Sequence, residues 1–223
     1  MIRCAIDYTG RKDITMKNKL YIAYGSNINL PQMSIRCPRA KVVGTSVIEN
    51  YELVFRGSPA YAVATIEKKE GASVSVLVWS IEPSDERALD RYEGYPHLYT
   101  KQDFQIELNG ETITAMAYVM TPGRSKGNPS RSYLQTIADG YAKFGFPKKV
   151  LFDAAVAVER AKQSQGAFAY CPRCGKHSMR NKLTHNAFSR RADIYVCESC
   201  GMSEALRDAT QFNDDIMEWD MFR

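Results

Sequence analysis

TKQDFQIELNGETITAMAYVM, residues 100–120, contains two strand-like runs joined by the dipeptide Asn109-Gly110. Both runs, 100–108 and 112–120, are rich in β-branched and aromatic residues, which favour β-strands. Asn-Gly between two such runs is a strong signal for the tight turn of a β-hairpin. This stretch therefore predicts a hairpin and indicates that the surrounding chain is built on a sheet.

Five more strand-like runs with partial alternation precede the hairpin, at residues 20–24, 41–47, 51–57, 61–67 and 73–81. Glycines such as Gly57 and Gly71 punctuate these runs. Seven strand-like runs within about a hundred residues predict a small barrel or a strongly curved sheet. The mouth of such a barrel is a place where a small ligand can bind.

Helical patterns occur at two places. One helix interrupts the strands at residues 84–94, with Ser84 as the expected N-cap and Gly94 as the stop. After residue 120 the apolar residues recur at helical spacing in two segments, which Gly145 and Pro147 separate. The predicted fold class is α+β, a small mixed β-barrel with covering helices.

Composition is that of a globular chain, with 223 residues, 44% hydrophobic and 25% charged. The net charge of +5 is mild and does not argue for nucleic acid. No apolar run approaches the roughly 18 residues that a membrane span needs. The first residues lack a secretory apolar region, so we expect a cytoplasmic protein without a membrane partner.

YGSN, residues 24–27, follows the first strand-like run. We expect Gly25 to adopt a positive φ, so that the turn aims its N–H groups and the Ser26 and Asn27 side chains at one point. Such a turn can bind a carboxylate or a polarised carbonyl. The alternative is an ordinary strand-to-helix turn, in which Ser or Asn caps the segment 30–37.

Glu93 lies within LDRYEGYPHLY, residues 89–99, where a carboxylate is crowded by aromatic residues. It lies near the end of the predicted helix, where the helix dipole disfavours negative charge. Neighbouring rings would desolvate it, and both effects raise the pKa of a carboxyl group. The alternative is a surface glutamate at a helix end, beside rings that pack inward.

The two stretches YGSN and LDRYEGYPHLY together resemble the γ-glutamylcyclotransferase-like family, which includes the AIG2-like proteins. The resemblance covers about residues 18–160, with softer matches at 36–40, 61–66, 117–120 and 129–147. It implies an enzyme that needs no organic cofactor and acts on a small γ-glutamyl substrate. The substrate's α-amine would attack its own γ-carbonyl, releasing 5-oxoproline and a free amine.

The resemblance also implies roles for particular residues. Glu93 would be the catalytic base and then the acid. The residues implied in substrate binding are Tyr24, Gly25, Ser26, Asn27, Tyr99 and Tyr118. The leaving amine stays open among glutathione, γ-glutamyl amino acids and γ-glutamyl-lysine crosslinks. The competing hypothesis is a mobile-element accessory protein, in which a non-catalytic barrel binds a small ligand and a C-terminal zinc ribbon docks a protein or nucleic acid.

Four of the six cysteines form CPRCG at 171–175 and CESCG at 197–201. Paired C-x-x-C motifs in a cytoplasmic chain favour a metal site over disulfides. Four thiolates complete the tetrahedron of a structural Zn²⁺, one per chain, and the alternative is a redox pair. The predicted ligands are Cys171, Cys174, Cys197 and Cys200, with His177 and His185 as competing ligands. This segment resembles zinc ribbons found in proteins of bacterial mobile elements and phages.

The sequence thus predicts an N-terminal extension at 1–17, a γ-glutamylcyclotransferase-like domain at 18–165, a zinc ribbon at 166–210 and an amphipathic tail at 211–223. A natural start at Met16 would make residues 1–15 an extension. Residues 171–223 hold eight basic and eight acidic residues, which makes nucleic acid an unlikely partner. In the tail, an apolar helical face that includes Trp219 would pack on the same chain or dock a second copy or another protein.

Overall fold

The computed structural model describes residues 18–58, 61–210 and 218–222. The expectations for the N-terminal extension, including a start at Met16, lie outside the described residues. Among these residues, no helix has both the length and the apolar character required to cross a membrane.

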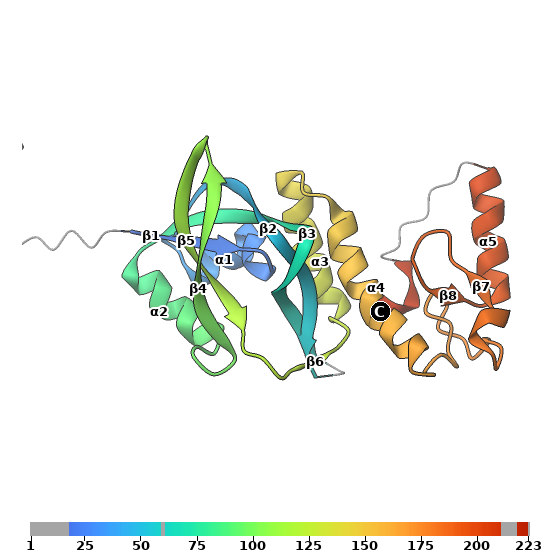
Figure 1. The fold of residues 1–223 in the computed structure, drawn as a ribbon. Helices are drawn as coiled ribbons and strands as arrows, with labels where there is room; N and C mark the ends of the chain where they lie inside the picture. The colour runs from blue at the N-terminus through green and yellow to red at the C-terminus, as the bar shows by residue number, and fades with distance from the viewer. Residues whose placement is uncertain (1–17, 59–60, 211–217, 223) are drawn as a thin grey trace, which may run out of the picture.

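A six-stranded sheet in the order β4-β5-β1-β3-β2-β6 forms the body of the molecule (Figure 1). Neighbouring strands are antiparallel except β1 and β5, which are parallel. The strands are β1 (Lys19–Ala23), β2 (Lys41–Gly57), β3 (Ala62–Ile81), β4 (Tyr99–Leu108), β5 (Glu111–Met120) and β6 (Ser125–Lys126).

The hairpin predicted at residues 100–120 is confirmed as β4 and β5. Asn109 and Gly110 have φ values of 54° and 84°, which place both turn residues in the left-handed region. Leu108 pairs directly with Glu111 across this turn. The positive φ values are those that a two-residue hairpin turn requires, and Asn-Gly tolerates them best.

Four of the other predicted runs merge in pairs into two long strands, β2 and β3. The pairing of β2 with β3 shifts register at Asn50, which has a φ of 61°. Gly71, with a φ of 73°, lies opposite it in β3. The Gly71 N–H donates to Asn50 Oδ1 at 3.1 Å. Gly71 therefore marks a bulge within a continuous strand, because extra residues of β3 face Asn50 and bend the pair.

The sheet curls until β2 meets β4, although these strands are not neighbours in the strand order. Ser46 Oγ donates to the Glu107 carbonyl at 2.6 Å. The rings of Tyr51 and Phe104 pack edge to face at 5.3 Å. The result is a mixed α+β fold with a curled half-barrel, in agreement with the strongly curved sheet predicted from the sequence.

The helices of this part of the chain are α1 (Leu30–Arg36), α2 (Pro83–Tyr92), α3 (Arg131–Phe144) and α4 (Lys148–Ser164), with a short 3₁₀ helix η1 (Ser26–Ile28). The predicted N-cap of α2 is wrong. Glu82 caps it instead, and its N–H donates to the Asp85 carboxylate at 3.1 Å in a capping box. Gly94, with φ of 61°, ends α2 as predicted, and Gly145 ends α3 in the left-handed conformation.

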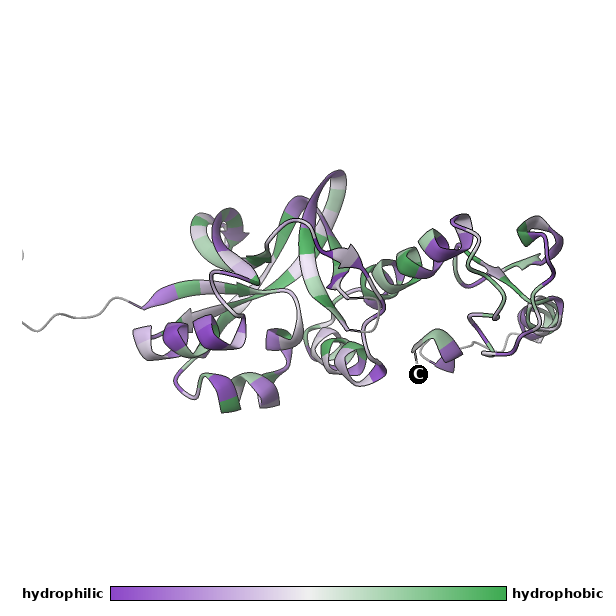
Figure 2. Cartoon of the chain, turned by 90° about the horizontal axis from the view of Figure 1, so that it is seen from below, coloured by the Kyte–Doolittle hydropathy of each residue, from purple (hydrophilic) through white to green (hydrophobic). Residues whose placement is uncertain are grey.

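Helix α3 lies against η1 because it has a glycine at the contact. A Cβ on Gly140 would lie 2.7 Å from Ile28 Cγ2, which is shorter than any real contact of this kind. Leu134, Ile137 and Tyr141 on the same helix are fully buried. Apolar and polar residues are mixed along both the strands and the helices (Figure 2).

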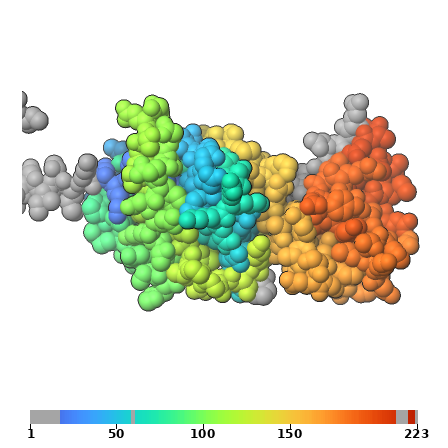
Figure 3. Space-filling view, in the orientation of Figure 1, coloured from blue at the N-terminus to red at the C-terminus, as the bar shows by residue number. Residues whose placement is uncertain are grey.

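The C-terminal part forms a smaller lobe beside the half-barrel, with α3 and α4 between them (Figures 1 and 3). It contains η2 (Leu183–His185), β7 (Ala187–Phe188), β8 (Tyr195–Val196), α5 (Glu198–Ala209) and η4 (Asp220–Phe222). Gln163 of α4 joins the lobes, because its amide donates to the Tyr195 carbonyl at 2.7 Å and accepts from the Tyr195 N–H at 2.9 Å. Arg160 pairs with Asp193 at 2.8 Å beside it.

The described end of the tail packs on this lobe. Trp219 is 2% exposed, and the Arg173 guanidinium lies 5.7 Å from the centre of its ring. The N–H groups of Asp220 and Met221 donate to the carbonyls of Arg173 and Pro172, both at 2.9 Å. This agrees with packing on the same chain, while most of the predicted helical face lies outside the described residues.

Candidate active site

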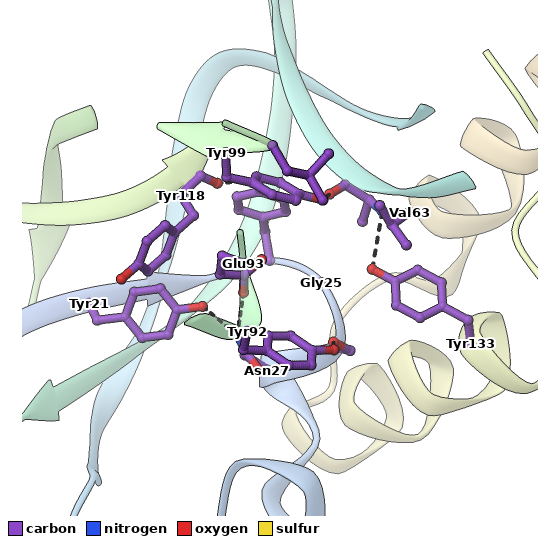
Figure 4. Close-up of a pocket in the computed structure, with 13 residues that line it drawn as sticks. Tyr21, Gly25, Asn27, Val63, Tyr92, Glu93, Tyr99, Tyr118 and Tyr133 are labelled. Carbon is purple, nitrogen blue, oxygen red and sulfur yellow. Dashed lines mark hydrogen bonds between the residues drawn. The ribbon is translucent and has the colours of Figure 1, made fainter. Parts of the chain in front are cut away.

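A cavity of about 210 Å³ opens at the end of β1, beneath the stretch that contains Glu93 (Figure 4). Its walls come from β1, η1, β3, α2, β4, β5 and α3 and from the turn after α2. The lining residues are Tyr21, Tyr24, Gly25, Ser26, Asn27, Val63, Ala64, Tyr92, Glu93, Leu98, Tyr99, Tyr118 and Tyr133. All seven residues that the sequence marks as catalytic or substrate-binding therefore meet here.

The YGSN turn differs from expectation at Gly25. Its φ is −110°, so the predicted positive φ is wrong. Space explains the glycine better, because a Cβ there would lie 3.3 Å from Ala64 Cβ and 3.4 Å from the Tyr133 hydroxyl. The turn leads directly into η1, which leaves the first N–H groups without intrahelical acceptors. Indeed, no described residue accepts a hydrogen bond from the N–H of Ser26 or Asn27.

Helix α1 is capped by Asn29, which accepts from the Gln32 N–H at 3.2 Å. The cap therefore lies outside YGSN, and the side chains of Ser26 and Asn27 face the cavity instead. Ser26 Oγ lies 3.2 Å from the Tyr92 hydroxyl. The alternative reading of YGSN as a capping turn does not describe this geometry.

Asn27 links the two sequence motifs. Its Nδ2 donates to Glu93 Oε1 at 2.9 Å and to the Tyr21 hydroxyl at 2.7 Å (Figure 4). Its Oδ1 accepts from Arg36 Nη1 at 2.6 Å. Every hydrogen-bonding atom of the Asn27 amide is thus engaged.

Glu93 is half-buried at the C-cap of α2. Burial raises the pKa of its carboxyl from an ordinary value of 4.5 to about 7, while the hydrogen bond from Asn27 and the charge of Arg36 oppose this shift. Of the rings next to it in sequence, Tyr92 and Tyr95 are 46% and 42% exposed, and only Tyr99 is buried. The rings that desolvate Glu93 therefore come mainly from distant strands, in contrast to the local crowding that the sequence suggests.

Three tyrosine hydroxyls at the cavity donate hydrogen bonds to other groups of the protein. Tyr24 donates to the Tyr118 carbonyl. Tyr99 donates to the Ala64 carbonyl at 2.7 Å. Tyr118 donates to Asp90 Oδ1 at 2.5 Å. Tyr24, Tyr99 and Tyr118 thus offer ring surface to a ligand, and burial keeps their hydroxyls neutral by raising their pKa.

Tyr133 is a lining residue that the sequence motifs do not mark. Its hydroxyl accepts from the Ala64 N–H at 3.1 Å, which leaves its own proton available toward the cavity. The helical spacing of residues 129–147 marks it only as a residue on a buried helix face. The sequence motifs also do not mark Tyr21 or Arg36 as site residues. The softer family matches at residues 36–40 and 129–147 are the signals that could have pointed to Arg36 and Tyr133.

The four cysteines of the C-terminal lobe converge. Their Sγ atoms all lie within 4.8 Å of one another, and those of Cys174 and Cys197 are 3.9 Å apart. A Zn²⁺ tetrahedron with Zn–S bonds of about 2.3 Å has an edge near 3.8 Å, so these sulfurs fit a metal ion. His177 instead packs edge to face on Tyr170.

The lobe is only partly like the expected ribbon. Cys171 and Cys174 lie on a loop that turns at Gly175, with φ of 70°. The second pair begins at Cys197, the N-cap of α5, and Cys200 lies in the first turn of that helix. The four-cysteine cluster thus joins a loop to a helix, with the short β7–β8 hairpin between them in sequence.

Comparisons with known proteins agree with this fold. The family model described as "Gamma-glutamyl cyclotransferase, AIG2-like" matches residues 21–139. A human protein named gamma-glutamylcyclotransferase is 29% identical over 151 residues, which cover 62% of this chain and 80% of the human protein. A bovine protein of the same name is 30% identical over 138 residues, covering 57% of this chain and 72% of that protein.

A solved structure titled "Gamma-glutamyl cyclotransferase" matches with a TM-score of 0.56 and 26% identity, covering 62% of this chain and 86% of that chain. The matched family segment contains the YGSN turn, Glu93 and all the other residues that line the cavity. The chain belongs to the AIG2-like γ-glutamylcyclotransferase family.

Proposed function

We propose that this protein cyclises γ-glutamyl amines or peptides, releasing 5-oxoproline and a free amine. The observation that carries the proposal is Glu93, a carboxyl group with a pKa of about 7 that is hydrogen-bonded to Asn27 of the YGSN turn inside the cavity. A general acid–base group works best when its pKa lies near the operating pH.

Binding folds the γ-glutamyl group back on itself. The free N–H groups of Ser26 and Asn27 and the hydroxyl proton of Tyr133 are the donors for the substrate's carboxylate or carbonyl oxygen. The cavity of about 210 Å³ is smaller than the usual site for a drug-sized ligand. It therefore suits the glutamyl half, which all candidate substrates share, and leaves the amine portion toward solvent.

The reaction needs one proton carrier. Ionised Glu93 takes a proton from the substrate's α-ammonium group, and the freed nitrogen attacks the γ-carbonyl carbon. The negative oxygen of the tetrahedral intermediate is stabilised by the N–H and hydroxyl donors. The bond from the carbonyl carbon to the leaving nitrogen then breaks as Glu93 returns the proton to the departing amine. The ring nitrogen gives its surplus proton to the ionised Glu93, and this proton then passes to the released amine or to water. Both reactants belong to one molecule, so the site mainly supplies orientation.

The C-terminal lobe would hold one structural Zn²⁺ through Cys171, Cys174, Cys197 and Cys200. These four thiolates would join the loop of the first pair to helix α5 through the ion and would leave no coordination position for a substrate. The ion's role is thus folding of the lobe, and it has no part in the proton transfers at Glu93.

The test is incubation of the protein with a panel of γ-glutamyl amines, including glutathione, γ-glutamyl amino acids and γ-glutamyl-lysine, with 5-oxoproline detected by mass spectrometry. Glu93→Gln is the inactive comparison, and Glu111→Gln at the exposed hairpin turn is the matched control. Release of 5-oxoproline by the wild type and the control alone supports the proposal. Absence of product from every member of the panel contradicts it.

A further inference from the structure

Arg36 lies behind the wall of the cavity, at the C-terminal end of α1. Its guanidinium is held on several sides. Nη1 donates to Asn27 Oδ1 at 2.6 Å, Nη2 donates to Gln32 Oε1 at 2.5 Å, and Cζ lies 3.8 Å from the centre of the Tyr92 ring. The side chain is therefore fixed by a neighbour on its own helix and by a ring of α2, without being part of the cavity lining.

The orientation of the Asn27 amide decides whether its nitrogen or its oxygen faces the Glu93 carboxylate. An asparagine amide has a donor end and an acceptor end, and rotation by half a turn exchanges them. With the acceptor end toward Glu93, two oxygens would oppose each other. An arginine has donors only, so the amide end that faces Arg36 must be the oxygen.

We propose that Arg36 is a positioning residue that fixes the Asn27 amide with its nitrogen toward Glu93. This deepens the proposed cyclotransferase function, on which its catalytic consequence rests, but the geometric effect exists without any substrate. Arg36 acts through Asn27 and through its charge, and it touches no reacting atom.

Arg36 also has an electrostatic effect on Glu93. Titratable side chains reach the cavity from β1, α2, β4, β5, α3 and the residues after β1, and they are Tyr21, Tyr92, Tyr99, Tyr118, Tyr133 and Tyr24. Burial raises the pKa of five of these hydroxyls further above its ordinary value, so they carry no charge near pH 7. The positive charge of Arg36 and the hydrogen bond from Asn27 both favour the ionised form of Glu93.

The deciding experiment is Arg36→Met in the full chain. The pKa of Glu93 is read by NMR titration of glutamate labelled with ¹³C at the side-chain carboxyl, and the signal is assigned with Glu93→Gln. Loss of a nearby opposite charge should raise the pKa by on the order of one unit. Arg39→Met is the matched control, because Arg39 is an arginine on the same segment that pairs with Glu82 at 2.9 Å instead.

Kinetics give the second readout. In Arg36→Met, the acidic limb of the pH profile of kcat/KM should shift to higher pH together with the pKa of Glu93. In Arg39→Met, the limb should stay at its wild-type pH. At a pH well above this limb, Arg36→Met should still lower kcat/KM when it is introduced into the wild-type protein. The same substitution should have little further effect on kcat/KM when it is introduced into the Asn27→Ala variant. Such non-additivity is expected if Arg36 acts through the amide.

The outcomes separate this inference from the proposed function. A shifted Glu93 pKa in a protein without cyclotransferase activity supports the effect of Arg36 on Glu93 and contradicts the proposed function. An unshifted pKa in folded Arg36→Met overturns the inference, even in an active enzyme. If Arg36→Met does not fold, Arg36→Gln is the substitute, because it loses the charge and its amide, which can donate or accept, no longer fixes which end of Asn27 faces it. The pKa must then still rise, and no rise overturns the inference.

Discussion

Glu93 is the residue on which the proposed chemistry depends, and its environment is unusual for a carboxyl group. Burial raises its pKa to about 7, while one hydrogen bond from Asn27 and the charge of Arg36 keep it from rising further. At neutral pH both protonation states are therefore populated. A group that takes and then returns one proton needs this balance.

Glu93→Gln should keep the fold and lower turnover by about a hundredfold or more, because an amide cannot carry the proton. The measurement is the initial rate of 5-oxoproline release, together with a thermal melt to verify folding. Glu111→Gln should behave like the wild type. Activity near the wild-type level in Glu93→Gln would remove this residue from the mechanism.

The same group makes stability depend on pH. Its pKa is near 4.5 when the chain is unfolded and about 7 when folded, so the folded state binds more protons between these values. Stability from this group therefore falls as pH rises through that window, and the full cost applies above pH 7. A shift of one pKa unit corresponds to about 1.4 kcal/mol, so a shift from 4.5 to about 7 sets an upper bound on this cost of about 3.5 kcal/mol.

Glu93→Gln removes this cost, so the variant should be more stable than the wild type at pH 8.5 and nearly equal to it at pH 5. Denaturant unfolding at several pH values gives the difference in the free energy of unfolding. The gap should widen as pH rises. A gap that is constant with pH would show that Glu93 does not have a raised pKa.

At the scale of elements, the site depends on how closely α3 approaches η1. Gly140 makes this approach possible, since a Cβ would lie 2.7 Å from Ile28 Cγ2. Helix α3 also carries Tyr133, whose hydroxyl reaches the Ala64 N–H across the cavity. The position of one helix thus sets both the η1 turn and a proposed substrate donor.

Gly140→Ala should destabilise the protein by about 1–3 kcal/mol, because overpacking must displace α3 or η1. In an ordinary helix the same substitution is stabilising. The expected kinetic result is a higher KM for the γ-glutamyl substrate. Gln135→Ala, on the exposed face of the same helix, is the control for general effects on α3. An unchanged KM and a more stable Gly140→Ala protein would show that this contact does not set the site.

At the scale of the whole molecule, the four-cysteine lobe is attached to the half-barrel through α4. The paired hydrogen bonds of Gln163 to Tyr195 resemble those of a neighbouring strand and join the lobe to α4. Every residue that lines the cavity lies between Tyr21 and Tyr133, outside this lobe. The proposed zinc site and the proposed active site should therefore be separable.

Metal analysis of the purified protein should find about one zinc per chain. Removal of the zinc by a chelator should unfold the lobe, read as faster hydrogen exchange of α5, and leave 5-oxoproline release intact. Cys174→Ser is the matching variant. Activity that disappears with the metal and returns with it would show that the lobe shapes the active site.

Local sequence was sufficient where the physical cause is local. Asn109-Gly110 predicts its hairpin because only the turn residues need positive φ, and the C-x-x-C spacing predicts which cysteines can share a metal. The motifs around Gly25 and Glu93 identify the family, and their residues line one cavity, although the expected φ of Gly25 and the expected N-cap of α2 were wrong. The φ of Gly25 and the N-cap of α2 both depend on residues outside the short stretch from which each was predicted.

Tertiary structure alone decided what surrounds Glu93. Rings from β1, β4, β5 and α3 desolvate it only because the sheet curls and α3 packs on η1. Asn27 reaches Glu93, and Arg36 reaches Asn27, through contacts between α1, η1 and the end of α2. The sequence by itself determined which carboxylate and which turn are present. The packing of distant elements determined the pKa of that carboxylate, because desolvation depends on everything that excludes water from it.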